Sequence, residues 1–203
     1  MLHVYVLPRP GVDDELLSLA RACVPLMAEH PIDPQLPGTG DGAGWLHLTV
    51  EMLADAPATD YDGPALQRLV DALETELASI APFTTEAGPP IANIAGAVLD
   101  VWPETDAEML REATRTAIRK ARGEDALQHQ GGRQHISLGY ADGTSSSDRL
   151  NSRLRNEITP RRAPLHVDRV HLLAVTWTED TVSGGWRMSW EPVAEIPLGG
   201  SPR

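Results

Sequence analysis

Apolar and polar positions repeat along the chain with two different periods. A period of two residues predicts β-strands, and it occurs at residues 3–7, 45–53, 83–87, 91–101, 133–140, 163–178 and 186–196. Apolar residues spaced three and four apart predict helices, and they occur at residues 13–27, 64–80, 105–120 and 147–158. Helices that fall between strands in this way indicate an α+β protein with mixed or antiparallel sheets.

Glycine and proline mark the expected breaks in this pattern. Residues 31–44 are rich in both and predict a loop with the length of a flap. Residues 88–90, Gly-Pro-Pro, predict a break between two strands, and Gly96 predicts a close backbone approach within the second of them. Residues 163–178 and 186–196 predict a closing antiparallel pair. On the helix at 105–120 we expect the basic side chains to point outward: Arg111, Arg115, Arg119 and Lys120.

One short string occurs twice, 88 positions apart. Residues 44–50 read Gly-Trp-Leu-His-Leu-Thr-Val, and residues 132–138 read Gly-Arg-Gln-His-Ile-Ser-Leu. Each copy has a glycine, two further residues, a histidine, an aliphatic residue, a hydroxyl residue and another aliphatic residue. Each copy lies in one half of the chain, which predicts two related lobes around a pseudo-twofold cleft.

The spacing within each string places its polar residues together. Side chains alternate faces along a strand, so His47 and Thr49 share one face, as do His135 and Ser137. The aliphatic residues between them point to the opposite face, where they can pack into a core. Two such strands facing one cleft would present two imidazoles and two hydroxyls, which suits a phosphate ester.

Cleavage of a phosphodiester at a ribose needs a base for the attacking oxygen and an acid for the departing one. Histidine titrates near neutrality and serves in either role, typically for about 10²–10⁴-fold each. The hydroxyls of Thr49 and Ser137 can donate hydrogen bonds to the non-bridging phosphate oxygens. The sequence contains no His-x-x-x-His pair, no His-Asp doublet and no cysteine cluster. We therefore expect no metal and no other cofactor.

Composition narrows the partners and the location. The 203 residues carry 17 basic and 29 acidic side chains, a formal net charge of −12. Such a chain is a poor match for a long DNA duplex, although a local cluster of basic groups can still bind a small anion. Cys23 is the single cysteine, so a reducing compartment fits best. No run approaches the roughly 18 to 20 apolar residues of a membrane helix, and no signal peptide is evident. We expect a cytoplasmic monomer without a membrane partner.

At this point the two strings resemble the paired H-x-[ST]-hydrophobic motifs of the two-histidine (2H) phosphoesterase superfamily, and within it the bacterial 2′-5′ RNA ligase-like proteins. The resemblance implies one bilobal domain over residues 1–203, with one motif strand per lobe, around 45–53 and 133–140. It implies metal-independent action on a 2′,3′-cyclic phosphate or 2′-5′ phosphodiester of RNA ends or nucleotides. By the same resemblance His47 is the proton donor and His135 the acceptor that activates water. The residues alone do not order these two roles.

Three further residues near the motifs have two possible roles each. Arg133 lies two positions before His135 and is a candidate phosphate ligand, with an exposed structural arginine as the alternative. Tyr140 and Trp45 are candidates for stacking a base at the mouth of the cleft, with core packing as the alternative.

The remaining tryptophans and histidines have no motif context. We expect core or rim positions for Trp102, Trp177, Trp186 and Trp190. We expect structural or surface positions for His3, His30, His129, His166 and His171. The last two are predicted to lie on opposite faces of one strand, and so not to form a ligand pair.

Two other functions stay open at this stage. The same cleft can serve a binding module that recognises a nucleotide phosphate or an RNA end with little or no turnover. It can also serve a biosynthetic or detoxifying enzyme that acts on a small cyclic phosphate unrelated to RNA.

Overall fold

The computed structural model describes residues 1–36, 43–179 and 186–199. In chain order its strands are β1 (Leu2–Val6), β2 (Ile32–Pro34), β3 (Leu48–Met52), β4 (Phe83–Asn93), β5 (Gly96–Trp102), β6 (His135–Ala141), β7 (Ala163–Val167), β8 (Arg169–Glu179) and β9 (Trp186–Pro197). The helices are α1 (Asp14–Met27), α2 (Gly63–Leu77), α3 (Thr105–Arg122) and α4 (Ser147–Glu157), with 3-10 turns at Ala58–Asp60 and Glu124–Ala126.

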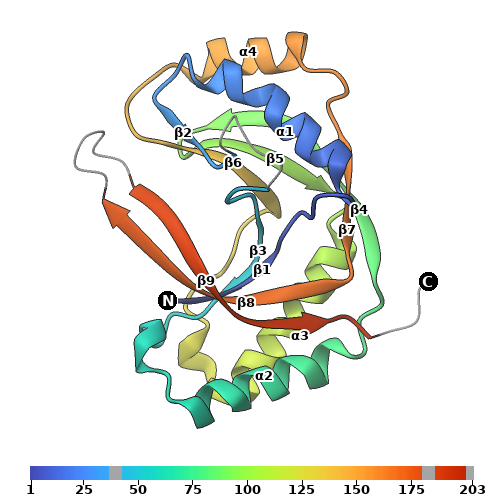
Figure 1. The fold of residues 1–203 in the computed structure, drawn as a ribbon, viewed down its shortest axis with the longest axis vertical. Helices are drawn as coiled ribbons and strands as arrows, with labels where there is room; N and C mark the ends of the chain where they lie inside the picture. The colour runs from blue at the N-terminus through green and yellow to red at the C-terminus, as the bar shows by residue number, and fades with distance from the viewer. Residues whose placement is uncertain (37–42, 180–185, 200–203) are drawn as a thin grey trace.

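All these strands belong to one antiparallel sheet. The order is β7-β4-β5-β6-β3-β1-β8-β9, and β2 pairs with β6 outside this path. The two motif strands, β3 and β6, are therefore neighbours at the centre of the path, with three strands beyond each. Figure 1 shows the helices as two pairs, α1 with α4 and α2 with α3, at opposite ends of the molecule. The predicted α+β class with two related halves is confirmed, with the sheet antiparallel.

Helices form where the sequence supplies both an apolar stripe and a start signal. At the start of α2 the Asp62 carboxylate accepts a hydrogen bond from the Ala65 backbone N–H at 2.6 Å, and Pro64 occupies the first turn as predicted. In α3 acidic residues lie in the first turn and basic residues in the last, which suits the helix dipole. Leu69 of α2 and Ile118 of α3 are fully buried.

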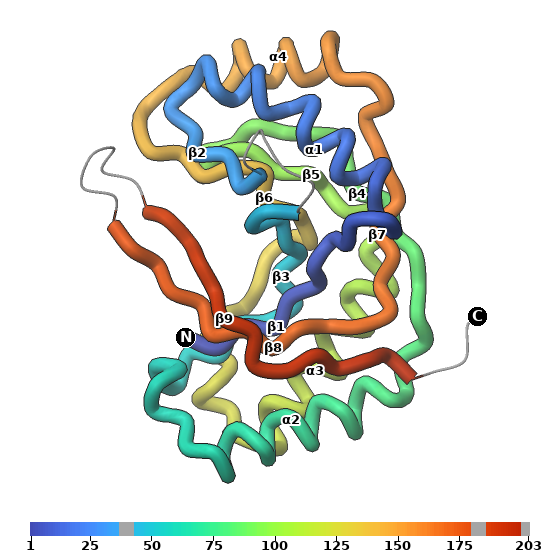
Figure 2. Tube along the Cα trace, viewed as in Figure 1, coloured from blue at the N-terminus to red at the C-terminus, as the bar shows by residue number. Residues whose placement is uncertain are grey.

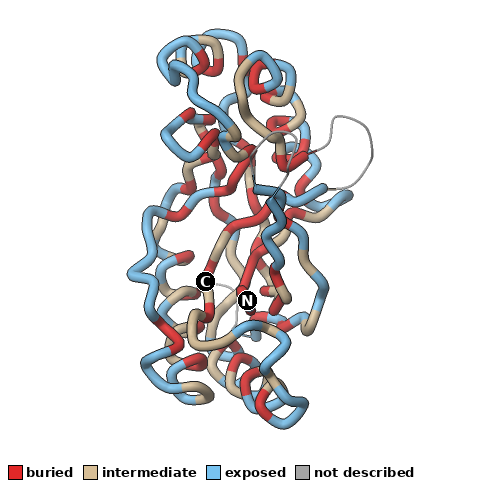
Figure 3. The backbone as a smooth tube through the Cα atoms, turned by 90° about the vertical axis from the view of Figure 1, so that its left-hand side faces the viewer, coloured by how far each residue is buried: buried red, intermediate tan, exposed pale blue. Residues whose placement is uncertain are grey.

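One buried apolar cluster extends through both halves. It includes Leu16 of α1, Leu69 of α2 and Leu154 of α4, together with residues of the central strands such as Leu48 and Leu138. Figure 3 shows the buried residues along the central strands and the exposed residues over the outer sides of the helices. Each fully buried side chain of this size contributes about 1.5–3 kcal/mol to folding, so this cluster holds the two motif strands in place.

The strand break expected at residues 88–90 lies elsewhere. β4 runs through these prolines and pairs with β5 on both sides of an irregularity between Ala87 and Pro90. The chain turns instead between Asn93 and Gly96, where the Asn93 side-chain oxygen accepts from the Ala95 N–H at 2.8 Å. The close approach expected at Gly96 is confirmed: its φ is +139°, and a Cβ there would lie 2.1 Å from the carbonyl oxygen of Gly139.

The single strand expected at residues 163–178 is two strands. β7 pairs with β4 at one end of the sheet, whereas β8 pairs with β1 and β9 in the other half. Figure 2 traces this passage of the chain from one half to the other. The apolar positions change phase at this point, from odd-numbered residues up to Val167 to even-numbered residues from Val170 onward. Asp168 is the one residue between the two strands, and the sequence analysis passed over this change of phase.

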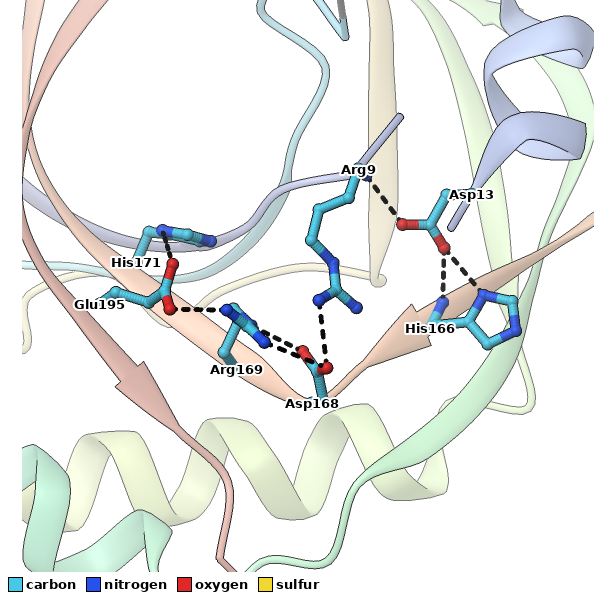
Figure 4. A network of polar contacts seen from close by, with 7 residues as sticks. All are labelled: Arg9, Asp13, His166, Asp168, Arg169, His171 and Glu195. Atoms are coloured by element: carbon cyan, nitrogen blue, oxygen red, sulfur yellow. Dashed lines mark hydrogen bonds and ion pairs between the residues drawn. The ribbon is translucent and has the colours of Figure 1, made fainter. Parts of the chain in front are cut away.

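Ion pairs surround this crossing point (Figure 4). The Asp168 carboxylate pairs with Arg9 at 3.1 Å and with Arg169 at 2.9 Å. Nearby, the Asp13 carboxylate lies 2.9 Å from both the backbone N–H and Nδ1 of His166. Asp168 thus connects the segment that follows β1 to the start of β8.

The crossing also changes the relation between two histidines. His166 lies on β7 and His171 on β8, so the expectation that they occupy opposite faces of one strand is wrong. His171 contacts Glu195 of β9 at 3.9 Å, whereas His166 contacts α1 through Asp13, the residue that precedes it.

The expected loop at residues 31–44 contains a short strand. Residues 32–34 form β2 and pair with β6, so this part of the segment is fixed to a motif strand. Residues 37–42 of the expected flap lie outside the described residues. Among the described ranges, no helix is both long and apolar enough to cross a membrane.

Candidate active site

His47 lies immediately before β3 and is 2 % exposed. Its Nδ1 is 2.7 Å from the carbonyl oxygen of Trp45. A carbonyl only accepts, so Nδ1 carries the hydrogen and Nε2 is the atom left for proton transfer. The ring stacks on Tyr5 of β1 with centroids 4.2 Å apart and an interplanar angle of 20°. These contacts fix both the tautomer and the orientation of the imidazole.

His135 begins β6 and repeats the same arrangement. Its Nδ1 is 2.8 Å from the carbonyl oxygen of Arg133, which again lies two residues earlier in the chain. The same reasoning leaves its Nε2 for proton transfer. Unlike His47, His135 is exposed. Each histidine thus makes the same kind of hydrogen bond to the carbonyl two residues earlier, which the two sequence strings did not reveal.

The register between the motif strands brings the two strings together. Leu48 and Ile136 are cross-strand partners in the antiparallel pair β3–β6. Continued by one residue in each direction, this register sets His47 opposite Ser137 and Thr49 opposite His135. All four polar residues therefore lie on the face of the sheet opposite to Leu48 and Ile136.

A pocket of about 420 Å³ opens on this face. Thr49, His135, Ser137 and Tyr140 line it, together with the segment 129–134 that leads into β6. His47 is buried beside these residues, and the charge of His135 is close enough to influence its titration. The volume is enough for a phosphate with an attached sugar.

Burial determines the charge state of His47. Burial is the main cause that lowers the pKa of His47 to about 4. The charge of His135 also lowers this pKa, whereas the hydrogen bond to the Trp45 carbonyl raises it. In the ligand-free protein the imidazole is therefore neutral at neutral pH. A bound phosphate anion would favour the protonated form and raise this pKa.

Two arginines line the pocket of this acidic chain. Arg133, whose side chain is 63 % exposed, pairs with Asp100 at 2.8 Å and with Glu104 at 3.1 Å. Its guanidinium lies at the site, but two carboxylates already share it. The sequence did identify this residue, through its spacing from His135.

The second pocket arginine, Arg111, does not point outward as the sequence predicted. Arg111 and Arg115 were predicted to point outward from α3, yet each side chain is only 15 % exposed. Both pair with the buried carboxylate of Glu51 on β3, Arg115 at 2.5 Å and Arg111 at 3.5 Å. Arg111 also donates to the Gln130 carbonyl at 2.8 Å, which connects α3 to the pocket rim. The helical pattern missed this because Glu51 is a charged partner beneath the helix.

Aromatic residues gather around the two motifs. Trp45 is 36 % exposed and packs edge-to-face on Trp190 of β9 at 4.7 Å. The Tyr140 hydroxyl donates to the Ser137 hydroxyl oxygen at 3.2 Å, and the Tyr140 ring packs against Trp177 of β8 at 5.2 Å. Trp190 also lies 5.7 Å from the His47 ring. Trp177 and Trp190 therefore border the site, which agrees with the core or rim positions expected for them.

The other expected core or rim tryptophans lie at the surface. Trp102 and Trp186 are each 56 % exposed, and the pocket lining includes neither. Among the histidines without a motif, His129 lines the pocket and His3 lies behind it. His30 contacts Ser145 and belongs to a different part of the surface.

His3 and Tyr5 of β1 are the main site neighbours that sequence reasoning missed. Nδ1 of His3 lies 2.6 Å from the Tyr5 hydroxyl oxygen, and both side chains are buried. Burial lowers the pKa of His3 to about 3, with further lowering by the charges of the N-terminus, His47 and His129. Two polar residues at alternate positions of a buried strand were the available signal. Within the described ranges, no group of three or more His, Cys, Asp or Glu side chains could hold a metal ion.

No family model matches the sequence, and no curated protein matches it in a sequence search. Solved structures do match over nearly the whole chain. TT0787 of Thermus thermophilus aligns with a TM-score of 0.65 and 17 % identity, over 98 % of each chain. E. coli LigT in complex with 3′-AMP aligns with a TM-score of 0.60 and 15 % identity, over 97 % of each chain. A structure described as a phosphoesterase aligns with a TM-score of 0.62 and 14 % identity, over 97 % of each chain. The chain therefore has the fold of LigT, of TT0787 and of the structure described as a phosphoesterase, as the resemblance of its paired motifs to 2H phosphoesterases predicted.

Proposed function

We propose that this protein is a metal-independent phosphodiesterase that acts on the 2′,3′-cyclic phosphate or a 2′-5′ phosphodiester of RNA ends or nucleotides. The observation that carries the proposal is the pairing of Leu48 with Ile136 between β3 and β6, from which we infer that the two His-hydroxyl units face each other. Crystal structures of E. coli LigT hold 3′-AMP, NADP⁺, ATP and phosphate, which supports a nucleotide phosphate as the ligand of this fold.

The chemistry uses the two Nε2 atoms, because each Nδ1 is occupied by a backbone carbonyl. One histidine takes a proton from water as the water oxygen bonds to phosphorus. The other gives a proton to the ribose oxygen as its bond to phosphorus breaks, and a phosphomonoester remains. The family resemblance assigns the donor role to His47 and the acceptor role to His135. For His47 to donate, the phosphate anion must first raise its low pKa.

The remaining site residues bind the substrate. Thr49 and Ser137 donate hydrogen bonds to the non-bridging oxygens, whose charge grows in the transition state. Arg133 adds a positive charge at the rim, moderated by Asp100 and Glu104. Trp45 presents an exposed aromatic surface for a base. Tyr140 lines the pocket, although its hydroxyl is directed to Ser137.

The test is hydrolysis of 2′,3′-cyclic AMP and of a 2′-5′-linked dinucleotide in excess EDTA, followed by chromatography. We expect turnover by the wild type, and a loss of about 10²–10⁴-fold in kcat for His47→Ala and for His135→Ala. His30→Ala is the matched control, because this histidine contacts Ser145 outside the pocket, and it should keep full activity. Activity that vanishes with EDTA, or survives both substitutions together, would falsify the proposal.

A second candidate, a binding module with little or no turnover, follows from one observation. His47 is 2 % exposed and neutral in the ligand-free protein, which makes it a poor resting acid. Nucleotide-dependent thermal stabilisation without any product would support this function. Detection of a ring-opened monophosphate would exclude it.

A further inference from the structure

Each motif hydroxyl has a tyrosine beside it. Tyr140 donates its hydroxyl hydrogen to the oxygen of Ser137 at 3.2 Å. Tyr5 is the cross-strand partner of Thr49 in the β1–β3 pair. This register places the Tyr5 and Thr49 side chains next to each other on one face of the sheet. The chain has three tyrosines, and two of them thus lie beside the two motif hydroxyls.

The direction of these hydrogen bonds determines whether a phosphate oxygen faces a hydroxyl hydrogen or the lone pairs of a hydroxyl oxygen. A serine or threonine hydroxyl has one hydrogen. If that hydrogen points to the tyrosine, the hydroxyl turns its lone pairs toward an anionic phosphate oxygen. If the tyrosine donates instead, the hydrogen of Thr49 or Ser137 is free to bond the phosphate. The Tyr140 contact has the second direction.

His3 supports the same direction on the other side. Its Nδ1 lies 2.6 Å from the Tyr5 oxygen, and its Nε2 is buried without a partner. A buried N–H without a partner is rarer than an acceptor without one, so the hydrogen of the neutral ring belongs on Nδ1. Nδ1 then donates to Tyr5, which leaves the Tyr5 hydrogen for Thr49. In the ligand-free structure the Tyr5 hydroxyl donates to Met188 Sδ at 3.8 Å, a weak acceptor that a hydroxyl oxygen can replace.

We propose that Tyr5 and Tyr140 are positioning residues that direct the hydroxyl hydrogens of Thr49 and Ser137 toward the phosphate. This inference rests on the proposed function of the site. The chain of donors is His3 to Tyr5 to Thr49 on one side and Tyr140 to Ser137 on the other. Tyr5 has a second contribution, because its ring also stacks on His47.

Double-mutant cycles test the inference. Tyr5→Phe and Tyr140→Phe keep the rings, and therefore the stacking on His47, but remove the donors. Each should lower kcat on 2′,3′-cyclic AMP by about 3- to 10-fold, the effect of one hydrogen bond, with KM changed by less than about twofold. In the background of Thr49→Val, Tyr5→Phe should have no further effect, and the same holds for Tyr140→Phe in Ser137→Ala. Tyr61→Phe is the control, since Tyr61 donates to Asp55 outside the pocket.

The outcomes separate this inference from the proposed function. Equal losses from Tyr5→Phe in the wild type and in Thr49→Val, with normal thermal unfolding, would overturn it, as would no loss in either tyrosine variant. If the wild type does not open 2′,3′-cyclic AMP, the proposed function fails, and the cycles are then measured by titration with inorganic phosphate. Two results together would still support the positioning role. Tyr5→Phe should bind phosphate more weakly than the wild type, and adding Tyr5→Phe to Thr49→Val should weaken phosphate binding no further than Thr49→Val alone. No phosphate binding by the wild type would overturn both.

Discussion

Leu48 of β3 and Ile136 of β6 are cross-strand partners at the centre of the sheet, and each is almost fully buried. An antiparallel pair has a local twofold axis between its partners, so the residue before one partner faces the residue after the other. Two strings 88 positions apart therefore become neighbours in the sheet. A slip of one residue would turn one string's polar residues to the other face.

The first prediction concerns this central pair. Leu48→Ala removes a side chain that is 1 % exposed, so we expect a loss of about 2–5 kcal/mol in the free energy of unfolding. Urea unfolding measures it. Leu66→Ala on α2, where the leucine is half-buried, is the control and should lose less. Equal losses in the two variants would mean that Leu48 is not a core contact.

The second prediction concerns the titration of His47. In the ligand-free protein its ring should titrate near pH 4, because burial lowers its pKa. Saturating inorganic phosphate should raise that pKa, since an anion favours the protonated ring. NMR of histidine-labelled protein follows both. A pKa near the ordinary 6.5 in the free protein would contradict the buried, neutral state of the ring.

Stability should fall in mild acid. Burial lowers the pKa of His3 to about 3 and of His47 to about 4, from 6.5 in the unfolded chain. Below pH 6.5 the unfolded state therefore binds more protons than the folded state. The free energy of unfolding is then greatest above pH 6.5 and declines as the pH falls toward 4, by about 1.4 kcal/mol per pH unit for each group.

Urea unfolding at a series of pH values tests this decline. His3→Asn should remove one group's share of the slope. A wild-type stability that is constant between pH 6.5 and pH 4 would contradict the prediction.

The last prediction concerns Arg133. Arg133→Ala should raise KM for 2′,3′-cyclic AMP by about 3- to 10-fold with little change in kcat, as expected for a rim charge that binds ground and transition states alike. Steady-state kinetics at two salt concentrations measures this, and the difference from wild type should shrink at high salt. Arg162→Ala, at an exposed ion pair with Glu86 away from the pocket, is the control. A loss in kcat alone would assign Arg133 a different role.

The sequence by itself determined which residues share a face. The alternation of a strand is local, so His47 with Thr49, and His135 with Ser137, could be grouped before any fold was known. The same local pattern placed the four helices and most strands, and the confirmed α+β class followed from their order. The roles of these residues, and the treatment of 1–203 as one domain, stay predictions.

Only the tertiary structure decided what depends on distant parts of the chain. The register of Leu48 on Ile136, the crossing of the chain at Asp168 and the inward direction of Arg111 arise from pairing and burial between segments far apart in sequence. The low pKa of His47 and the place of Tyr5 beside Thr49 likewise need β1 beside β3. A linear pattern fixes the face of a side chain, whereas its neighbours and its solvation come from the assembled sheet.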